Sequence, residues 1–194
     1  MMNALEDFHL VTPLKPFHFY GQEIVVKDET QQVTGAFKIR GAYNFIIQNL
    51  ENGKHYRTAS TGNHGIAVAA ACNQIDCRAE IFVPVNCCNT KVQKIKSFGA
   101  SIVKIDGVYD DCLKACLDSR YGFPSIYVPS FDDMSVIKGH MSMFSEIDKQ
   151  LAGRRDIILF VPIGGGGLVA SALLYYKGLD IRVIGVEHDV LPAM

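Results

Sequence analysis

The chain has 194 residues, of which 48% are hydrophobic and 20% charged, and its net charge of −1 fits a globular α/β protein of one or two domains. It has no basic tract, no apolar stretch of transmembrane length and no signal-peptide pattern at its start, which argues against a nucleic-acid partner, a membrane partner and secretion. We therefore expect a cytoplasmic protein with six reduced cysteines, whose spacing predicts no zinc site.

Apolar runs separated by helical patterns extend along the chain. They predict strands near residues 24–27, 56–59, 79–83, 101–105, 126–128, 157–161 and 181–187. Because these strands alternate with helices, we expect open parallel sheets in an α/β architecture.

Lys38 has the most unusual setting of any residue in the chain. It lies in the run Thr34-Gly35-Ala36-Phe37-Lys38-Ile39-Arg40-Gly41-Ala42, where the glycine permits a turn and the apolar residues after the lysine predict a helix. An amine at such a helix start faces a partly dry interior, which lowers its pKa and favours the neutral form that Schiff-base chemistry needs. The alternative is a lysine that extends from a helix N-terminus into solvent.

A polar loop gives the second signal. The run Ala59-Ser60-Thr61-Gly62-Asn63-His64-Gly65 follows a short predicted strand and precedes an alanine-rich helix over 66–72. Hydroxyl and backbone N–H groups at this helix N-terminus can hold a carboxylate, and Asn63 can reach a polar ring substituent. The alternative is that Ser60, Thr61 or Asn63 is a simple N-cap, and His64 alone is more often structural than catalytic.

A glycine loop gives the third signal. The run Pro162-Ile163-Gly164-Gly165-Gly166-Gly167-Leu168 lies between the predicted strand 157–161 and a predicted helix over 169–174. Four adjacent glycines let successive N–H groups converge on a phosphate, and the helix dipole adds to the attraction. Neither a P-loop lysine nor the GxGxxG spacing is present, so the loop does not indicate a nucleotide. The alternative is a flexible connection, which carries a large entropy cost.

A reactive lysine, a phosphate loop and a carboxylate loop together point to pyridoxal 5'-phosphate acting on an amino acid. Over nearly its whole length the chain also resembles the fold-type II (tryptophan synthase β-like) pyridoxal-phosphate enzymes, in their threonine/serine dehydratase and serine racemase branch. Besides the three motifs, the matching landmarks are Thr12-Pro13-Leu14, Lys27-Asp28-Glu29, Val83-Pro84-Val85, Lys91 with Lys94, Phe98-Gly99-Ala100, Ser130-Phe131-Asp132-Asp133 and Val186-Glu187.

The resemblance implies a role for each motif. Lys38 would form the imine with the cofactor and act as the catalytic base, and Phe37 would pack beside the cofactor ring. Asn63 would bind the ring hydroxyl, and Thr61 occupies the position where racemizing relatives carry a catalytic serine. The cofactor phosphate would be held by Gly164, Gly165, Gly166, Gly167 and Leu168. The substrate carboxylate would be bound by Ser60, Thr61, Gly62, Asn63 and His64.

Individual residues indicate the dehydratase and racemase branch of the family, and others differ from the pattern of that branch. Ile39 and His64 stand where sulfhydrylase-like and threonine synthase-like relatives usually carry an aspartate and a threonine. The run Gly139-His140-Met141-Ser142 replaces the Gly-Gln-Gly-Thr that is typical of the branch. The residues after Glu187 do not reproduce the acidic pattern of metal-binding relatives, so we predict no metal.

The resemblance further implies two open parallel-sheet domains. Residues 1–53 and 135–194 would form a larger, discontinuous cofactor-binding domain that is incomplete at its C-terminus, and residues 54–134 a smaller domain with the substrate loop. Family chains continue beyond the last predicted strand and supply the group that faces the pyridine nitrogen. We therefore expect weak cofactor binding and slow turnover from this chain alone, and either a homo-oligomer (dimer) or a second, completing chain as partner.

The predicted function is that of a pyridoxal-phosphate-dependent ammonia-lyase, a dehydratase that converts L-threonine or L-serine to a 2-keto acid and ammonia. The alternatives are a serine racemase, a β-replacement synthase, and an inactive or partner-dependent fragment.

Overall fold

The computed structural model describes residues 10–52, 54–118 and 125–190, which form an α/β fold. The strands are β1 (Leu14–Phe19), β2 (Gln22–Lys27), β3 (His55–Ala59), β4 (Arg78–Pro84), β5 (Ser101–Ile105), β6 (Ile126–Tyr127), β7 (Ile158–Pro162) and β8 (Arg182–Val186). The α-helices are α2 (Lys38–Gln48), α3 (Asn63–Gln74), α4 (Asn89–Ser97), α5 (Tyr109–Leu117), α6 (Met134–Gln150) and α7 (Gly167–Tyr175), and short 3-10 turns cover Glu29–Gln31 and Leu50–Asn52. All seven predicted strands are confirmed, to within a few residues at their ends.

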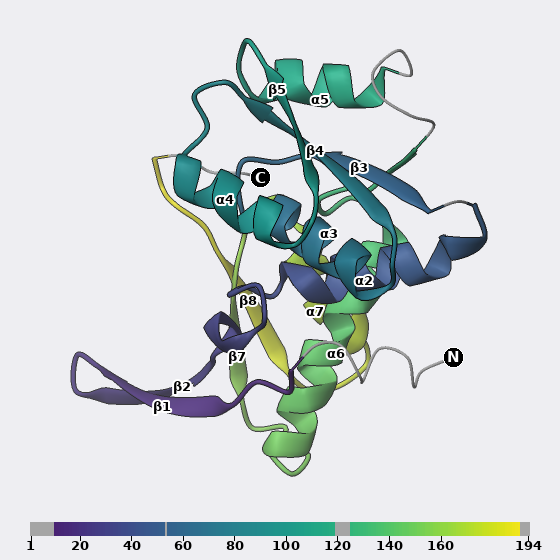
Figure 1. Ribbon diagram of the computed structural model, residues 1–194. Coiled ribbons are helices and arrows are strands. Elements are labelled where there is room, and N and C mark those ends of the chain that lie inside the picture. The colour runs from purple at the N-terminus through teal and green to yellow at the C-terminus, as the bar shows by residue number, and fades with distance from the viewer. Residues whose placement is uncertain (1–9, 53, 119–124, 191–194) are drawn as a thin grey trace.

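A four-stranded parallel sheet in the order β5-β4-β3-β6 forms one half of the molecule (Figure 1). Alternate residues of β4 point to opposite faces, as the two-residue period of a strand requires. Ile81 and Val83 pack with α2, α3 and α4, while Phe82 packs with Cys112 and Cys116 of α5 on the other face. Because both faces are covered by helices, the centre of this strand, from Ile81 to Val83, is apolar without alternation.

The other half of the molecule contains β7 and β8, which form a parallel pair, together with α6 and α7 (Figure 1). Its core includes Met143, Phe144 and Ile147 of α6 packed with Leu168 and Ala172 of α7. The four-stranded sheet lies wholly within residues 54–134, and the pair β7-β8 within residues 135–194. The division into two domains at these boundaries remains a prediction.

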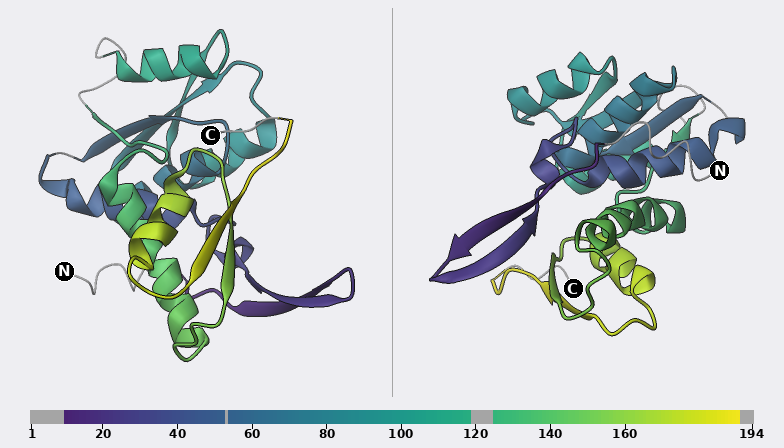
Figure 2. Two further views of the ribbon diagram at one scale, coloured as in Figure 1. Left: turned by 180° about the vertical axis from the view of Figure 1, so that it is seen from behind. Right: turned by 90° about the horizontal axis from the view of Figure 1, so that it is seen from below.

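The prediction of parallel sheets alone is wrong for the N-terminal region. There β1 and β2 form an antiparallel hairpin that projects from the rest of the fold (Figure 2). Tyr20 and Gly21 connect the strands with φ angles of 46° and 73°, and two such residues in succession form the tight turn of a two-residue hairpin. The sequence of β1, LKPFHF, contains a proline and a lysine among its apolar residues, so its pattern did not predict a strand.

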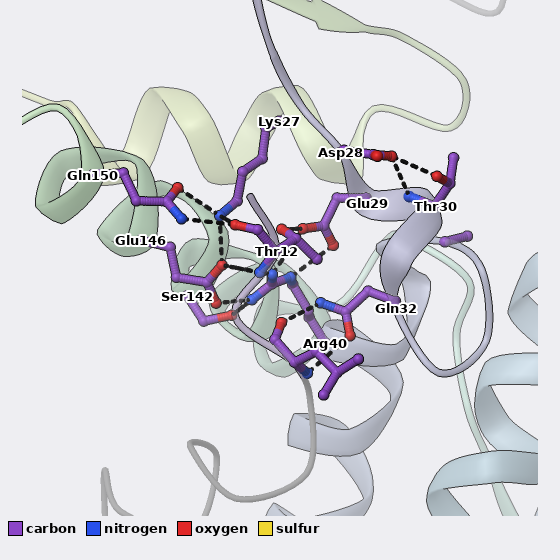
Figure 3. A network of polar contacts seen from close by, with 12 residues as sticks. Thr12, Lys27, Asp28, Glu29, Thr30, Gln32, Arg40, Ser142, Glu146 and Gln150 are labelled. Carbon is purple, nitrogen blue, oxygen red and sulfur yellow. Dashed lines mark hydrogen bonds and ion pairs between the residues drawn. The ribbon is translucent and has the colours of Figure 1, made fainter. Parts of the chain in front are cut away.

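A buried network of charges joins this N-terminal region to α2 and α6 (Figure 3). Arg40 is fully buried, and its guanidinium donates to Glu29 at 2.8 Å and to Glu146 at 2.6 and 2.9 Å. Lys27 donates to the same Glu146 carboxylate at 2.7 Å. Burial alone would raise the pKa of Glu146, but hydrogen bonds and charge from Arg40 and Lys27 outweigh burial and hold this pKa below its ordinary value. Arg40 lies two residues after Lys38, so the network also anchors the helix that carries the lysine.

Helices α2 and α6 cross at two glycines, which brings their backbones close together. A Cβ atom on Gly139 would lie 2.4 Å from the Arg40 carbonyl oxygen and 2.8 Å from the Gly41 Cα. A Cβ atom on Gly41 would lie 2.5 Å from the His140 ring. The run Gly139-His140 therefore serves close packing against the lysine helix, and Ser142 accepts from Arg40 at 3.1 Å.

Candidate active site

Lys38 is the first residue of α2, and its amine points into the protein. Its Nζ donates to the backbone carbonyl of Ser130 at 2.7 Å and lies 5.4 Å from the centroid of the Phe37 ring. Burial lowers the pKa of Lys38 because the charged ammonium is poorly solvated there. The lysine is therefore not a solvated surface side chain, and a larger fraction of its amine is neutral than in water.

Two buried histidines surround the lysine. His64 of α3 is 5% exposed, and its Nε2 lies 3.2 Å from the Val128 carbonyl oxygen. His140 of α6 is fully buried and meets the Phe37 ring edge-on, with 5.0 Å between ring centroids. Burial, together with the charge of Lys38, lowers the pKa of His64 to about 4 and that of His140 to about 3. Both imidazoles are therefore neutral at pH 7, and neither places a positive charge beside Lys38.

The loop from Ser60 to His64 lies at the N-terminus of α3. The backbone N–H of Gly62 donates to the Ser60 hydroxyl at 3.2 Å, and Asn63 is exposed as the first residue of the helix. The predicted N-cap alternative is wrong in its detail, because Gly62 is the N-cap and no side chain caps this helix. His64 turns its ring into the interior, so only its backbone can take part in binding a carboxylate. Thr61 is half-buried.

The glycines of the loop before α7 differ in whether the structure requires a glycine at their position. Gly166 is the N-cap of α7 and has a φ of 78°, which favours glycine. A Cβ on Gly165 would lie 2.3 Å from the Phe131 ring, and one on Gly167 would lie 3.0 Å from the Phe131 Cβ. Gly164 has no atom within 4 Å of that position, so neither backbone strain nor packing requires a glycine there. The Leu168 side chain lies in the core, which leaves only its backbone to contribute to binding.

A short segment after β6, from Val128 to Phe131, connects all three motifs. The carbonyl of Val128 contacts His64, the carbonyl of Ser130 accepts from Lys38, and the Phe131 ring packs against Gly165. We name this stretch the junction segment. Its role could not be predicted from the sequence, because backbone carbonyls and a phenylalanine give no chemical signal. The only hint was that residues 130–133 matched a family landmark.

The site contains no cluster of metal ligands in the described residues. Across residues 10–52, 54–118 and 125–190, no three His, Cys, Asp or Glu side chains are grouped so that they could hold a metal ion. No helix in this part of the chain is long and apolar enough to span a membrane.

Comparisons with known proteins identify the family. Residues 5–194 match the family model described as "Pyridoxal-phosphate dependent enzyme". The chain belongs to this family. It is 34% identical over 172 residues to threonine dehydratase 2 of Solanum lycopersicum, and the matched region covers 86% of this chain and 28% of that protein. It is 33% identical over 178 residues to the L-threonine ammonia-lyase of Thermotoga maritima, and the matched region covers 90% of this chain and 44% of that protein.

Solved structures show the same similarity. The processed form of threonine deaminase isoform 2 from Solanum lycopersicum superposes with a TM-score of 0.85 at 32% identity, covering 94% of this chain and 52% of that one. Maize serine racemase superposes with a TM-score of 0.87 at 27% identity, covering 96% of this chain and 58% of that one. These likenesses confirm the predicted fold-type II architecture. The chain thus spans about half of these structures and less than half of the two enzymes above.

The residues present fit the cofactor of this family. Pyridoxal phosphate needs an amine for its aldehyde and donors for its phosphate. Lys38 offers an amine with a lowered pKa, and the loop before α7 offers backbone N–H groups at the N-terminus of a nine-residue helix. A side chain at Gly164 would occupy open space beside these donors, as expected where a ligand approaches the backbone.

Proposed function

We propose that this protein is a pyridoxal-phosphate-dependent ammonia-lyase that converts L-threonine or L-serine to a 2-keto acid and ammonia. The observation that carries the proposal is the junction segment, because it links a desolvated lysine, a helix N-terminus with polar residues and a glycine loop. The names of the relatives, threonine dehydratase and L-threonine ammonia-lyase, support the same reaction.

The binding roles follow from the positions of the residues. Lys38 would hold the cofactor through Nζ, with Phe37 beside its ring and Asn63 at its ring hydroxyl. The backbone from Gly164 to Leu168 would hold its phosphate. The substrate carboxylate would lie at the N-terminus of α3, where the first N–H groups of a helix lack intrahelical acceptors and the helix dipole favours an anion.

The catalytic role falls to the Lys38 amine. When bound, the cofactor withdraws electron density from the substrate's α-carbon. Lys38 Nζ would be released when the substrate amine takes its place on the cofactor. The freed amine then takes the α-proton as general base, which requires the neutral form that burial favours. Loss of the β-hydroxyl with a proton, as water, leaves an enamine, which hydrolyses to the 2-keto acid and ammonia. His64 and His140 stay neutral throughout and add no positive charge beside the amine.

A racemase is the second candidate function. The similarity to maize serine racemase supports it, and Thr61 carries a hydroxyl on the loop that would bind the substrate. A threonine hydroxyl is a poor acid and base unless a neighbour activates it. We therefore place racemization second and include its product in the test.

The experiment is incubation of the chain with pyridoxal phosphate and L-threonine or L-serine. We expect a 2-keto acid, detected as its hydrazone, together with equimolar ammonia, and neither from Lys38→Ala. Lys138→Ala, on the outer part of α6, is the matched control and should retain the activity. D-serine as the main product would favour the racemase, and thioether formation from an activated serine without any keto acid would contradict the lyase.

The proposal also includes the cellular location of the protein and its partner. All six cysteines are thiols, which supports a cytoplasmic location. Ile158, Phe160 and Val186 of the β7-β8 pair are each about half exposed or more, which supports a second copy or a completing chain as partner. Size-exclusion chromatography with light scattering would show a mass above that of one chain.

A further inference from the structure

The glycine loop needs a partner that fixes its shape. Consecutive glycines lose more conformational entropy on ordering than any other residues, so a loop of four does not hold its N–H groups in one direction by itself. A binding site is strong only if its donors are already oriented before the ligand arrives. The question is which side chain of this protein orients them.

Phe131 contacts the loop at two of its four glycines. Its ring atoms Cδ1, Cε1 and Cγ occupy the space where a Gly165 side chain would begin, at 2.3 to 2.5 Å from the ideal Cβ position. Its Cα, Cβ and carbonyl oxygen lie 3.0 to 3.1 Å from the same position on Gly167. Phe131 itself is 39% exposed, so the core does not require it, but the loop backbone is packed directly against it.

The surroundings of the loop differ from one glycine to the next. A small cavity of about 210 Å³ is lined by Phe131, Asp132 and the glycines at 165–167, among other residues. At Gly164, by contrast, nothing lies within 4 Å of the Cβ position. A phosphate would be repelled by a carboxylate in the lining of the cavity, whereas the space at Gly164 has no such group within 4 Å, which favours a phosphate at Gly164.

The same segment also holds the lysine. The residue before Phe131 accepts the hydrogen bond from Lys38 Nζ at 2.7 Å, so adjacent residues contact the amine and the loop. An aldehyde and a phosphate on one rigid cofactor must reach both places at once. A single short segment that contacts both fixes the distance between them.

We propose that Phe131 is a positioning residue of the phosphate site: it braces Gly165 and Gly167, holds the loop backbone in one shape while the space at Gly164 stays open for the phosphate, and so provides selectivity for the phosphorylated cofactor. This inference rests on the proposed function, because it assumes that the loop binds the cofactor phosphate. Phe131 does not touch the reacting atoms, so its effect is on binding of the phosphate rather than on the chemistry at Lys38.

The test compares two aldehydes that differ only in the phosphate. The chain, freed of cofactor, is titrated with pyridoxal phosphate and with pyridoxal, and imine formation is followed by absorbance. Phe131→Ala should weaken pyridoxal phosphate binding about tenfold or more while changing pyridoxal binding by less than about twofold. Phe131→Leu keeps apolar atoms over Gly165 and should fall between Phe131→Ala and the wild type.

The control is Phe17→Ala on the β1-β2 hairpin, a phenylalanine of comparable exposure at 53% that should change neither affinity. If the wild type prefers pyridoxal phosphate and both Phe131 variants retain that preference in full, the role of Phe131 is wrong and the proposed function stands. Equal loss for both aldehydes would mean that Phe131 acts only on folding or on Lys38, and would also overturn the inference. If the wild type itself shows no preference for the phosphorylated aldehyde, the phosphate loop is wrong, and with it the cofactor site.

Discussion

Two neighbouring glycines, Gly164 and Gly165, give a matched pair of substitutions for the phosphate loop. Neither has a positive φ, so neither is in the left-handed region that disfavours alanine, and the substitution reduces the entropy of the unfolded chain equally at both sites. The difference in unfolding free energy between Gly164→Ala and Gly165→Ala therefore measures only what the new methyl group meets in the folded protein.

The structure predicts a large difference. At Gly164 the methyl group enters open space, and the variant should be as stable as the wild type or more stable by about 0.4–1 kcal/mol. At Gly165 it would lie 2.3 Å from the Phe131 ring, about 1 Å closer than an ordinary contact, and the ring must move. Overpacking of this kind typically costs about 1–3 kcal/mol, so Gly165→Ala should be less stable than Gly164→Ala by that amount.

Cofactor binding should be weakened even in the variant that keeps its stability. Gly164→Ala places its methyl group on the side proposed for the phosphate, so it should weaken pyridoxal phosphate binding without loss of stability. The assay is urea unfolding followed by far-UV circular dichroism, together with a cofactor titration at 25 °C. Equal stability of the two variants would refute the packing argument, and unchanged cofactor affinity in Gly164→Ala would refute the assignment of the open side.

Three further predictions concern the structure around Lys38. Glu146→Gln should lower the unfolding free energy by about 3 kcal/mol or more, because it weakens the buried network of Arg40 and Lys27. The control Glu23→Gln, on the exposed hairpin, should change the unfolding free energy by less than about 0.5 kcal/mol, and urea midpoints measure both variants. Gly139→Ala should cost about 3 kcal/mol because its methyl group meets the α2 backbone at 2.4 Å, and a melting temperature equal to that of the wild type would contradict the close helix crossing. Acid should destabilise the protein as the pH falls from 6.5 toward 4. His64 and His140 take up protons in the unfolded chain at these pH values, whereas burial keeps them neutral in the folded protein. Each lowered histidine pKa therefore reduces the unfolding free energy by roughly 3 kcal/mol or more by pH 4. His140→Gln should reduce the pH dependence of the urea midpoint by about half, and an unchanged dependence would show that the buried imidazole is not responsible.

The sequence predicted all six parallel strands of the described residues because their signal is local. Strand β5 was predicted with its observed bounds, and β4 was found because Ile81, Phe82 and Val83 form an apolar run between turn signals. Strand β1 was missed, since Lys15, Pro16 and His18 interrupt its pattern and it is exposed on both faces. Its pairing with β2 depends on the turn at Tyr20-Gly21 rather than on hydrophobic periodicity.

The site was predicted in its motifs but not in its connections. The surroundings of Lys38 suggested burial, and the structure shows an amine with a lowered pKa. The contacts of Val128 and Ser130 could not be predicted, because they are made by backbone carbonyls whose position depends on tertiary packing. The glycines suggested a phosphate loop, yet two of them also accommodate the Phe131 ring, a contact that only the fold reveals.

The central claim is that Lys38 is the residue that bonds the cofactor, and reduction with borohydride tests it most directly. The chain is mixed with pyridoxal phosphate, reduced, digested and analysed by mass spectrometry, with Lys38→Ala treated in parallel. We expect one dominant phosphopyridoxyl label on the peptide that contains Lys38, and its absence in the variant. A dominant label on any other lysine, or equal labelling of the wild type and Lys38→Ala, would contradict it.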